Sequence, residues 1–221
     1  MTANSILPDD ALKDVLRIIE RNAARLLADA RLMFDAARYP TALALSILSM
    51  EEAGKYYLVK WQNTPKKSGH DAPAAKGRHA HRQKQSVAST FHIAGSVKAF
   101  LREDVGRRLG LEGAASEQQV MAFFHAMSYH RDKPDSEFRA LAVETEREIE
   151  VLLAKAIASS KGAALQQKAF QGEIDNLKQR GLYVDVSAEG KVVADPNSIT
   201  KDNASEWIDN ASVLVSKLGK P

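Results

Sequence analysis

The stretch RYPTALALSILSMEEAGKYYLVKW, residues 38–61, is the most apolar long run of the chain and predicts its central helix. Apolar side chains fall on nearly every side of such a helix, which is typical of a buried one. Charged residues interrupt it at Glu51, Glu52 and Lys55. On a helical wheel Glu52 shares a face with Tyr56, whereas Glu51 and Lys55 lie at its edge and can pair with each other. We therefore expect Glu52 to point into a core or a cleft, where an unpaired charge is costly and needs a partner.

Periodic apolar residues predict further helices on both sides of this stretch. A long amphipathic helix over residues 8–38 precedes it and ends at Tyr39-Pro40, because the residue before a proline resists the helical conformation. The connection is short, so the two helices are expected to form an antiparallel pair. Later helices are expected over residues 77–109 and 116–130, from Ser136 onward, around residues 165–177 and over residues 200–218.

The sequence pattern changes once, near the C-terminus. Residues 182–199 alternate and contain a turn signal at Glu189-Gly190, so they predict a small hairpin or an extended excursion. Thr200 can then cap the last helix, and Ser116 to Gln119 reads as a capping box for an earlier one. The expected fold is all-α, a bundle of about six or seven helices that forms one domain over residues 1–221.

The composition excludes several classes of protein. The 221 residues include no cysteine, which excludes disulfides and thiolate metal sites and fits a reducing compartment. The N-terminus lacks the pattern of a signal peptide, and no uncharged apolar run is long enough to span a membrane. We therefore expect a cytoplasmic protein with no membrane partner.

Positive charge gathers in one segment. Residues 63–76 hold two prolines and a glycine and predict a mobile loop. Over residues 64–85 six lysines and arginines face a single acid, Asp71, and three histidines are added to them. Such a segment is typical of contact with an anionic partner such as RNA, DNA or a nucleotide phosphate, although a solvated loop with surplus lysine has the same composition.

The polar residues near this segment suggest a chemistry. The sequence contains no phosphate-binding glycine loop, no zinc-protease motif and no serine-hydrolase elbow, so neither a metal nor a cofactor is expected. His81 and Lys84 are neighbours one helical turn apart, and the imidazole is suited to proton transfer while the ammonium can stabilise negative charge. With Glu52 to orient His81 or pair with Lys84, these residues resemble the catalytic groups of a metal-independent ribonuclease. A salt-bridge cluster that only fixes two helices remains the alternative. Positive side chains that could bind the substrate are Lys55, Arg78 and Arg82.

Three stretches resemble the AbiV family of abortive-infection proteins, a branch of the all-α HEPN superfamily. The first is ALSILSMEEAGKYYLVK in the central helix, and the second is His81-Arg82-Gln83-Lys84, which is similar to the family's H-x-x-K. The third is LKQRGLYVDVSAEGKVVADPNSIT before the last helix. Together they cover roughly residues 20–210 in the family's order.

The resemblance implies a bacterial phage-defence effector that arrests growth or translation in an infected cell. HEPN relatives are commonly homodimers that cleave RNA with an R-x4–6-H motif, and a phage-encoded activator is compatible with such a role. This chain departs from the motif, because Arg78 lies three residues before His81 and Arg131 follows His125. Two hypotheses follow. Either Glu52, His81 and Lys84 replace the usual pair, or the protein is a non-catalytic RNA- or protein-binding effector that blocks the translation machinery. A third hypothesis is a nucleotide-binding module that uses the basic loop and Lys55.

Overall fold

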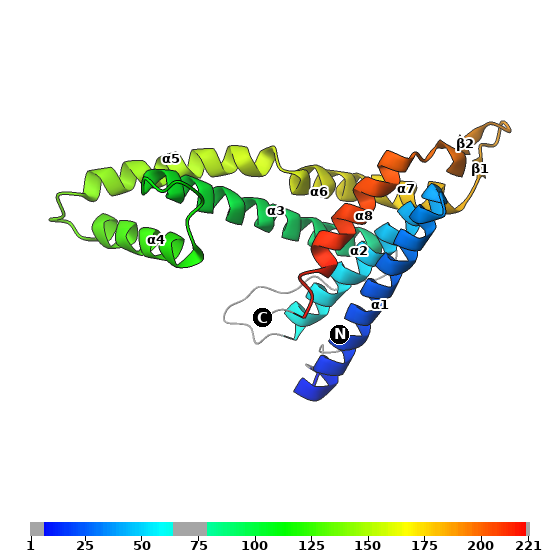
Figure 1. Cartoon of the computed structure of the whole chain (residues 1–221), viewed down its shortest axis with the longest axis horizontal. Helices are drawn as coiled ribbons and strands as arrows, with labels where there is room; N and C mark the ends of the chain where they lie inside the picture. Colours follow the sequence, from blue (N-terminus) through cyan, green and yellow to red (C-terminus); the bar gives the residue numbers. More distant parts are fainter. Residues whose placement is uncertain (1–6, 64–78, 220–221) are drawn as a thin grey trace. The chain divides into compact units, whose positions relative to one another are not determined.

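The computed structural model describes residues 7–63 and 79–219, and Figure 1 shows their arrangement along the chain. The predicted basic loop, residues 63–76, lies outside the described residues except for Asn63, and so does Arg78. The described elements are α1 (Asp9–Asp35), α2 (Tyr39–Gln62), α3 (His79–Arg108), α4 (Glu117–Asp132), α5 (Arg139–Ala158), α6 (Lys161–Gln171), α7 (Glu173–Leu182), β1 (Asp185–Val186), β2 (Val192–Ala194), the 3-10 helix η1 (Pro196–Ser198) and α8 (Lys201–Val215).

The all-α class with a small C-terminal hairpin is confirmed. β1 and β2 pair antiparallel, with an irregular register between Asp185 and Val186. The described residues contain eight α-helices. The count exceeds the prediction because Gly172, with a φ of 77°, separates α6 from α7 where the periodicity alone predicted one helix. A residue with a left-handed backbone conformation ends an α-helix, and glycine adopts this conformation without a steric penalty.

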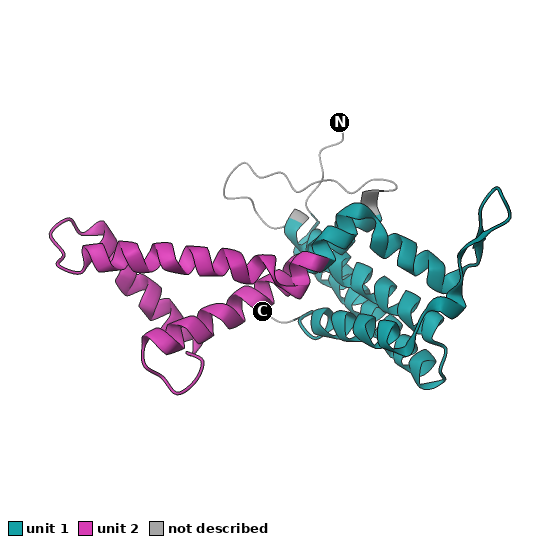
Figure 2. Cartoon of the chain, turned by 90° about the horizontal axis from the view of Figure 1, so that it is seen from above, with its two compact units in different colours: residues 1–89, 165–221 teal, residues 90–164 magenta. Residues whose placement is uncertain are grey.

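The described chain divides into two compact units, coloured separately in Figure 2. Unit 1 comprises residues 1–89 and 165–221, and unit 2 comprises residues 90–164. The boundaries fall within α3 and α6. The prediction of one domain over residues 1–221 stays a prediction.

In unit 1, α2 is the central helix, as the sequence predicted. It packs against α1, α7 and α8, and Figure 1 shows α1, α2 and α8 side by side. Its side chains Leu43, Ile47 and Met50 are among the largest that are fully buried in the described chain. The turn between α1 and α2 is tight because Ala37 adopts a positive φ of 56°, and Pro40 occupies the first turn of α2. Because α2 is apolar on nearly every side, it lies in the interior of unit 1, where α1, α7 and α8 cover it.

Two glycines allow neighbouring helices to approach α2 closely. A Cβ atom on Gly54 of α2 would overlap the backbone carbonyl of Lys84 in α3. A Cβ atom on Gly181 of α7 would lie 2.6 Å from the carbonyl oxygen of Pro40. Both obstacles are backbone atoms, which cannot move aside as a flexible side chain can. The backbones of α3 and α7 are thus held against α2 at contacts that only glycine permits.

We expect Gly54→Ala to destabilise the protein by about 1–3 kcal/mol, the usual cost of forcing an extra methyl group into a packed interface. Urea unfolding followed by circular dichroism measures the change. Gly113→Ala is the matched control, because nothing lies within 4 Å of a Cβ atom built on Gly113. Equal midpoints for the two variants would contradict the close approach of α3 to α2.

Unit 2 contains the second part of α3 together with α4 and α5, and α4 packs against α5. The capping box predicted at the start of α4 is confirmed, since the Ser116 hydroxyl accepts from Gln119 N and the Gln119 side chain accepts from Ser116 N. No residue of α4 is buried. Unit 2 therefore leaves much of α4 exposed.

The last helix begins as the sequence predicted. The Thr200 hydroxyl accepts from Asn203 N and the Asn203 side chain accepts from Thr200 N, which forms a second capping box. Across residues 7–63 and 79–219, none of the helices has the length and apolar character needed to cross a membrane.

Candidate functional site

A buried carboxylate, Glu51, lies at the centre of a polar cluster in unit 1. Its side chain is 3% exposed and has three partners from two other helices. From α3, His81 Nδ1 lies 2.8 Å from Glu51 Oε2, and Gln85 Nε2 donates to Oε1 at 2.7 Å. From α7, Lys178 Nζ donates to Oε1 at 2.8 Å. The cluster thus joins α2, α3 and α7 through one carboxylate.

The sequence spacing explains why these side chains meet. His81 and Gln85 are separated by four residues, so they point from the same side of α3. Glu51 lies one turn before Gly54, and Lys178 lies one turn before Gly181, so both charged residues stand next to the close contacts described above. The glycines bring the backbones together, and the charges meet in the space beside them.

Lys178 carries the opposite charge in the cluster. Its side chain is 6% exposed and lies 2.8 Å from both Glu51 Oε1 and Asp175 Oδ1. Burial by itself lowers the pKa of Lys178, but the hydrogen bonds and charges of Asp175 and Glu51 outweigh that effect and raise it. The ammonium group therefore stays charged and compensates the buried carboxylate.

The predicted orientation of the two glutamates is wrong. Glu51 is the buried residue, whereas Glu52 is 19% exposed and pairs with Lys55 at 3.5 Å. The expected pair between Glu51 and Lys55 is replaced by this pair between residues three apart. The helical wheel predicted the wrong glutamate because α2 is apolar on nearly every side. Hydrophobicity alone therefore does not indicate which side of α2 is covered by α3 and α7.

His81 is the most accessible member of the cluster. Its side chain is 45% exposed while its Nδ1 atom is held by Glu51, and within the described part of the chain its Nε2 atom has no hydrogen-bond partner. A carboxylate only accepts, so Nδ1 carries the hydrogen of this contact, and in a neutral ring Nε2 is then the acceptor. The structure thus holds an imidazole in a fixed orientation with one nitrogen available.

The other site residues predicted from the sequence differ in their exposure and in their partners. Lys84 follows one turn later on α3, is partly exposed, and forms no ion pair with any described residue. Arg82 is exposed, and its guanidinium lies against Gly172 at the start of α7. Glu52 is paired with Lys55 rather than with His81 or Lys84. The structure therefore brings His81 and Lys84 to the same side of α3 but replaces Glu52 by Glu51.

A family model described as AbiV, of the HEPN class, matches residues 11–216. The chain belongs to the AbiV family. Membership indicates an abortive-infection type of function, as the resemblance of the three stretches predicted. No curated protein and no solved structure matches the chain.

The site of this AbiV protein includes residues that the sequence analysis missed. Lys178 and Gln85 complete the cluster, and Glu51 takes the place predicted for Glu52. One signal was present in the sequence: Lys178 follows Ile174 by four residues and precedes Gly181 by three, so it falls on the buried stripe of α7. A lysine in that position predicts a buried partner of opposite charge.

The cluster could in principle attract a metal ion. Glu51, His81 and Asp175 each offer one ligand atom, and these atoms lie within 4.8 Å of one another. The Lys178 ammonium, however, already contacts both carboxylates at 2.8 Å. A divalent cation would have to displace this lysine, so the donor set fits an internal ion pair better than a metal centre.

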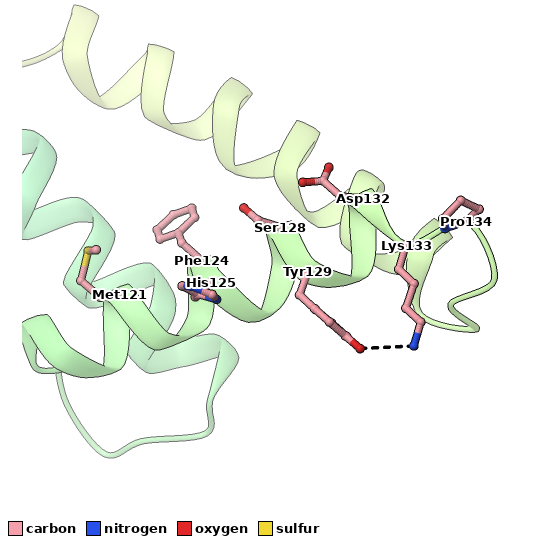
Figure 3. Close-up of a pocket in the computed structure, with 8 residues that line it drawn as sticks. All are labelled: Met121, Phe124, His125, Ser128, Tyr129, Asp132, Lys133 and Pro134. Atoms are coloured by element: carbon pink, nitrogen blue, oxygen red, sulfur yellow. Dashed lines mark hydrogen bonds between the residues drawn. The ribbon is translucent and has the colours of Figure 1, made fainter. Parts of the chain in front are cut away.

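A cavity in unit 2 lies along α4, and Figure 3 shows the residues that line it. Its volume is about 650 Å³, and it is lined by α4 and the turn that follows it. Lys133 Nζ donates to the Tyr129 hydroxyl at 3.2 Å, and both residues line the cavity (Figure 3). No described carboxylate contacts His125, the histidine of this cavity. It lacks the oriented acid–base pair found at Glu51 and His81, so size does not make it the better catalytic candidate.

Proposed function

We propose that this AbiV protein arrests the growth of an infected cell by cleaving RNA without a metal ion, with His81 as the residue that transfers the proton. One observation carries the proposal: a half-exposed imidazole is anchored through Nδ1 to a buried carboxylate. A base held in this way keeps one nitrogen directed away from its anchor, and acid–base enzymes commonly orient a histidine by a carboxylate.

The chemistry follows from the groups around His81. Nε2 accepts the proton of a ribose 2′-hydroxyl, the 2′-oxygen bonds to the adjacent phosphorus, and the bond from phosphorus to the 5′-oxygen breaks. The resulting imidazolium returns its proton to the leaving 5′-oxygen. The products are a 2′,3′-cyclic phosphate and a 5′-hydroxyl. Lys84 supplies a cation for the charge that develops on the phosphate, and Arg82 contacts the RNA backbone.

Glu51 is a positioning residue in this scheme, because it touches His81 rather than the substrate. Its carboxylate fixes the tautomer and the ring orientation, and it stabilises the imidazolium that forms during transfer. Lys178 and Gln85 hold Glu51 in turn. Lys55 and Arg78, the other positive side chains predicted from the sequence, remain candidates for contacts with the RNA.

The test is direct. Purified protein is incubated with total RNA in the presence of a chelator, and the ends of any fragments are mapped. We expect fragments that end in a 2′,3′-cyclic phosphate. An intact RNA pool would exclude cleavage of the RNAs supplied and favour the second candidate.

The second candidate is a non-catalytic effector that binds RNA or protein and blocks the translation machinery. Two observations favour it: the chain lacks the R-x4–6-H motif, and the Glu51–Lys178 pair satisfies its own charge as a structural ion pair does. This function predicts translation arrest with intact RNA, and an association that weakens as the salt concentration rises.

We also propose that the protein is a homodimer joined through α4. HEPN relatives are commonly homodimers, which favours a dimer, and the absence of buried residues in α4 favours this surface. The cavity residues drawn in Figure 3 follow α4 from Met121 to Asp132, and Met121 and Tyr129 are among the exposed apolar residues of unit 2. A twofold contact would cover this face with the same face of the second copy.

Light scattering at micromolar concentration should give twice the chain mass of 24.2 kDa. Tyr129→Glu should lower the mass to that of a monomer, because it buries a charge in the proposed contact. Leu32→Glu, a matched change at an exposed residue of α1, should leave the dimer intact. A monomeric wild type would rule out the dimer, and a dimeric Tyr129→Glu would rule out the α4 surface.

A further inference from the structure

A polar cavity lies between the end of α7 and the β1–β2 hairpin, elements that Figure 1 labels next to each other. Its volume is about 460 Å³, within the range of small-molecule sites. It is lined by none of the groups that contact Glu51. The segment that forms it, LYVD and the hairpin that follows, has no role in the cleavage chemistry. The cavity is therefore separate from the site proposed for cleavage.

Arg180 brings unused hydrogen-bond donors to this cavity. Its Nη2 atom donates to the Ser198 hydroxyl at 3.2 Å, but its Nε atom is buried and has no hydrogen-bond partner among the described residues. A guanidinium carries five N–H donors, and the Ser198 contact uses one of them, so donors on the two Nη atoms are left for a ligand in the cavity. Because the guanidinium is a planar fork, it is suited to a ligand with two adjacent acceptors.

Asp185 adds an acceptor to the same lining. Its Oδ1 atom accepts from Val186 N at 2.9 Å, and an ionised carboxylate has further lone pairs for a donor of the ligand. A free phosphate would be attracted by Arg180 but repelled by Asp185. A neutral ligand with one acceptor edge and one donor edge satisfies both residues.

Tyr183 supplies a flat surface. Its side chain is 60% exposed although it lines the cavity, and Val193 lines the cavity beside it. Exposed aromatic rings of this kind stack on nucleobases. The ligand is thus expected to be planar as well as neutral.

We propose that this cavity binds a purine base, with guanine as the best match. Guanine presents O6 and N7 as adjacent acceptors for Arg180, and its N1–H and amino group as donors for Asp185. Tyr183 stacks on the ring. The base belongs either to a free nucleotide or to an unstacked residue of RNA. Binding of this kind does not require cleavage, so the inference stands independently of the function proposed for His81.

Calorimetry on the full chain tests it with GMP, AMP, UMP and inorganic phosphate as separate titrants. We expect GMP to bind at least tenfold more tightly than UMP, and phosphate to give no heat. Tyr183→Ala and Arg180→Gln should each weaken GMP binding at least tenfold, with urea midpoints checked to exclude misfolding. Phe170→Ala, which removes an exposed aromatic ring of α6, should leave GMP binding unchanged.

A single-stranded oligonucleotide with one guanine, titrated into His81→Ala so that it stays intact, identifies the source of the base. Tighter binding of the oligonucleotide than of GMP assigns the cavity to RNA, and tighter binding of GMP assigns it to a free nucleotide. Phosphate binding as strong as GMP binding would overturn the proposal in favour of a simple anion site. Failure of all titrants, or wild-type affinity in Arg180→Gln and Tyr183→Ala, would overturn it outright.

Discussion

Lys178→Met is expected to lower the free energy of unfolding by about 3–5 kcal/mol, the usual cost of removing one partner of a buried ion pair. The variant leaves the Glu51 carboxylate 3% exposed and without the ammonium that compensates it. Methionine fills most of the volume of the lysine stem, so the loss is electrostatic rather than a cavity effect. Urea unfolding measures it as a lower midpoint with an unchanged slope.

Lys55→Met is the matched control for this loss. It removes the same kind of side chain from a lysine–glutamate pair that is 3.5 Å long and whose lysine is 42% exposed, which costs about 0–1 kcal/mol. The double variant Glu51→Gln with Lys178→Met removes both charges and should recover most of the stability. A Lys178→Met midpoint equal to that of Lys55→Met would contradict the buried pair.

Features of the fold that depend on local sequence could be predicted. The central position of α2 could be predicted because Leu43, Ile47 and Met50 repeat at helical spacing inside a long apolar run. The two capping boxes could be predicted because Ser116 and Thr200 act on residues three positions away. These features depend on local spacing, which the sequence contains directly.

The polar cluster depends on contacts that are distant in the sequence. Lys178 lies 127 residues after Glu51, and no local pattern connects them. Which of Glu51 and Glu52 is buried depends on the helices that cover α2. A helical wheel identifies a buried side only when one side is more apolar than the other, and α2 is apolar on nearly every side. His81 was found because a histidine near a basic segment is chemically distinctive, whereas its carboxylate partner required the packing of α3 on α2.

His81→Ala is expected to reduce RNA cleavage by about 10²–10⁴-fold, the usual contribution of a positioned acid–base group. The imidazole is 45% exposed and held by Glu51, so the substitution removes the proton acceptor from the site. The rate is measured with a chelator present on a labelled oligonucleotide. His125→Ala, at a histidine of α4 that contacts no described carboxylate, is the control and should retain wild-type cleavage.

Added imidazole separates a catalytic role of His81 from a structural one. A free imidazole that enters the space left in His81→Ala can accept the 2′-hydroxyl proton and restore part of the rate, whereas it cannot rebuild a helix contact. Circular dichroism and the urea midpoint show whether the variant is folded while this is measured. In cells, His81→Ala should lose toxicity together with RNA cleavage. A folded variant that cleaves RNA at the wild-type rate would remove His81 from the mechanism. A folded variant that stays toxic although its RNA remains intact would instead assign the arrest of growth to binding.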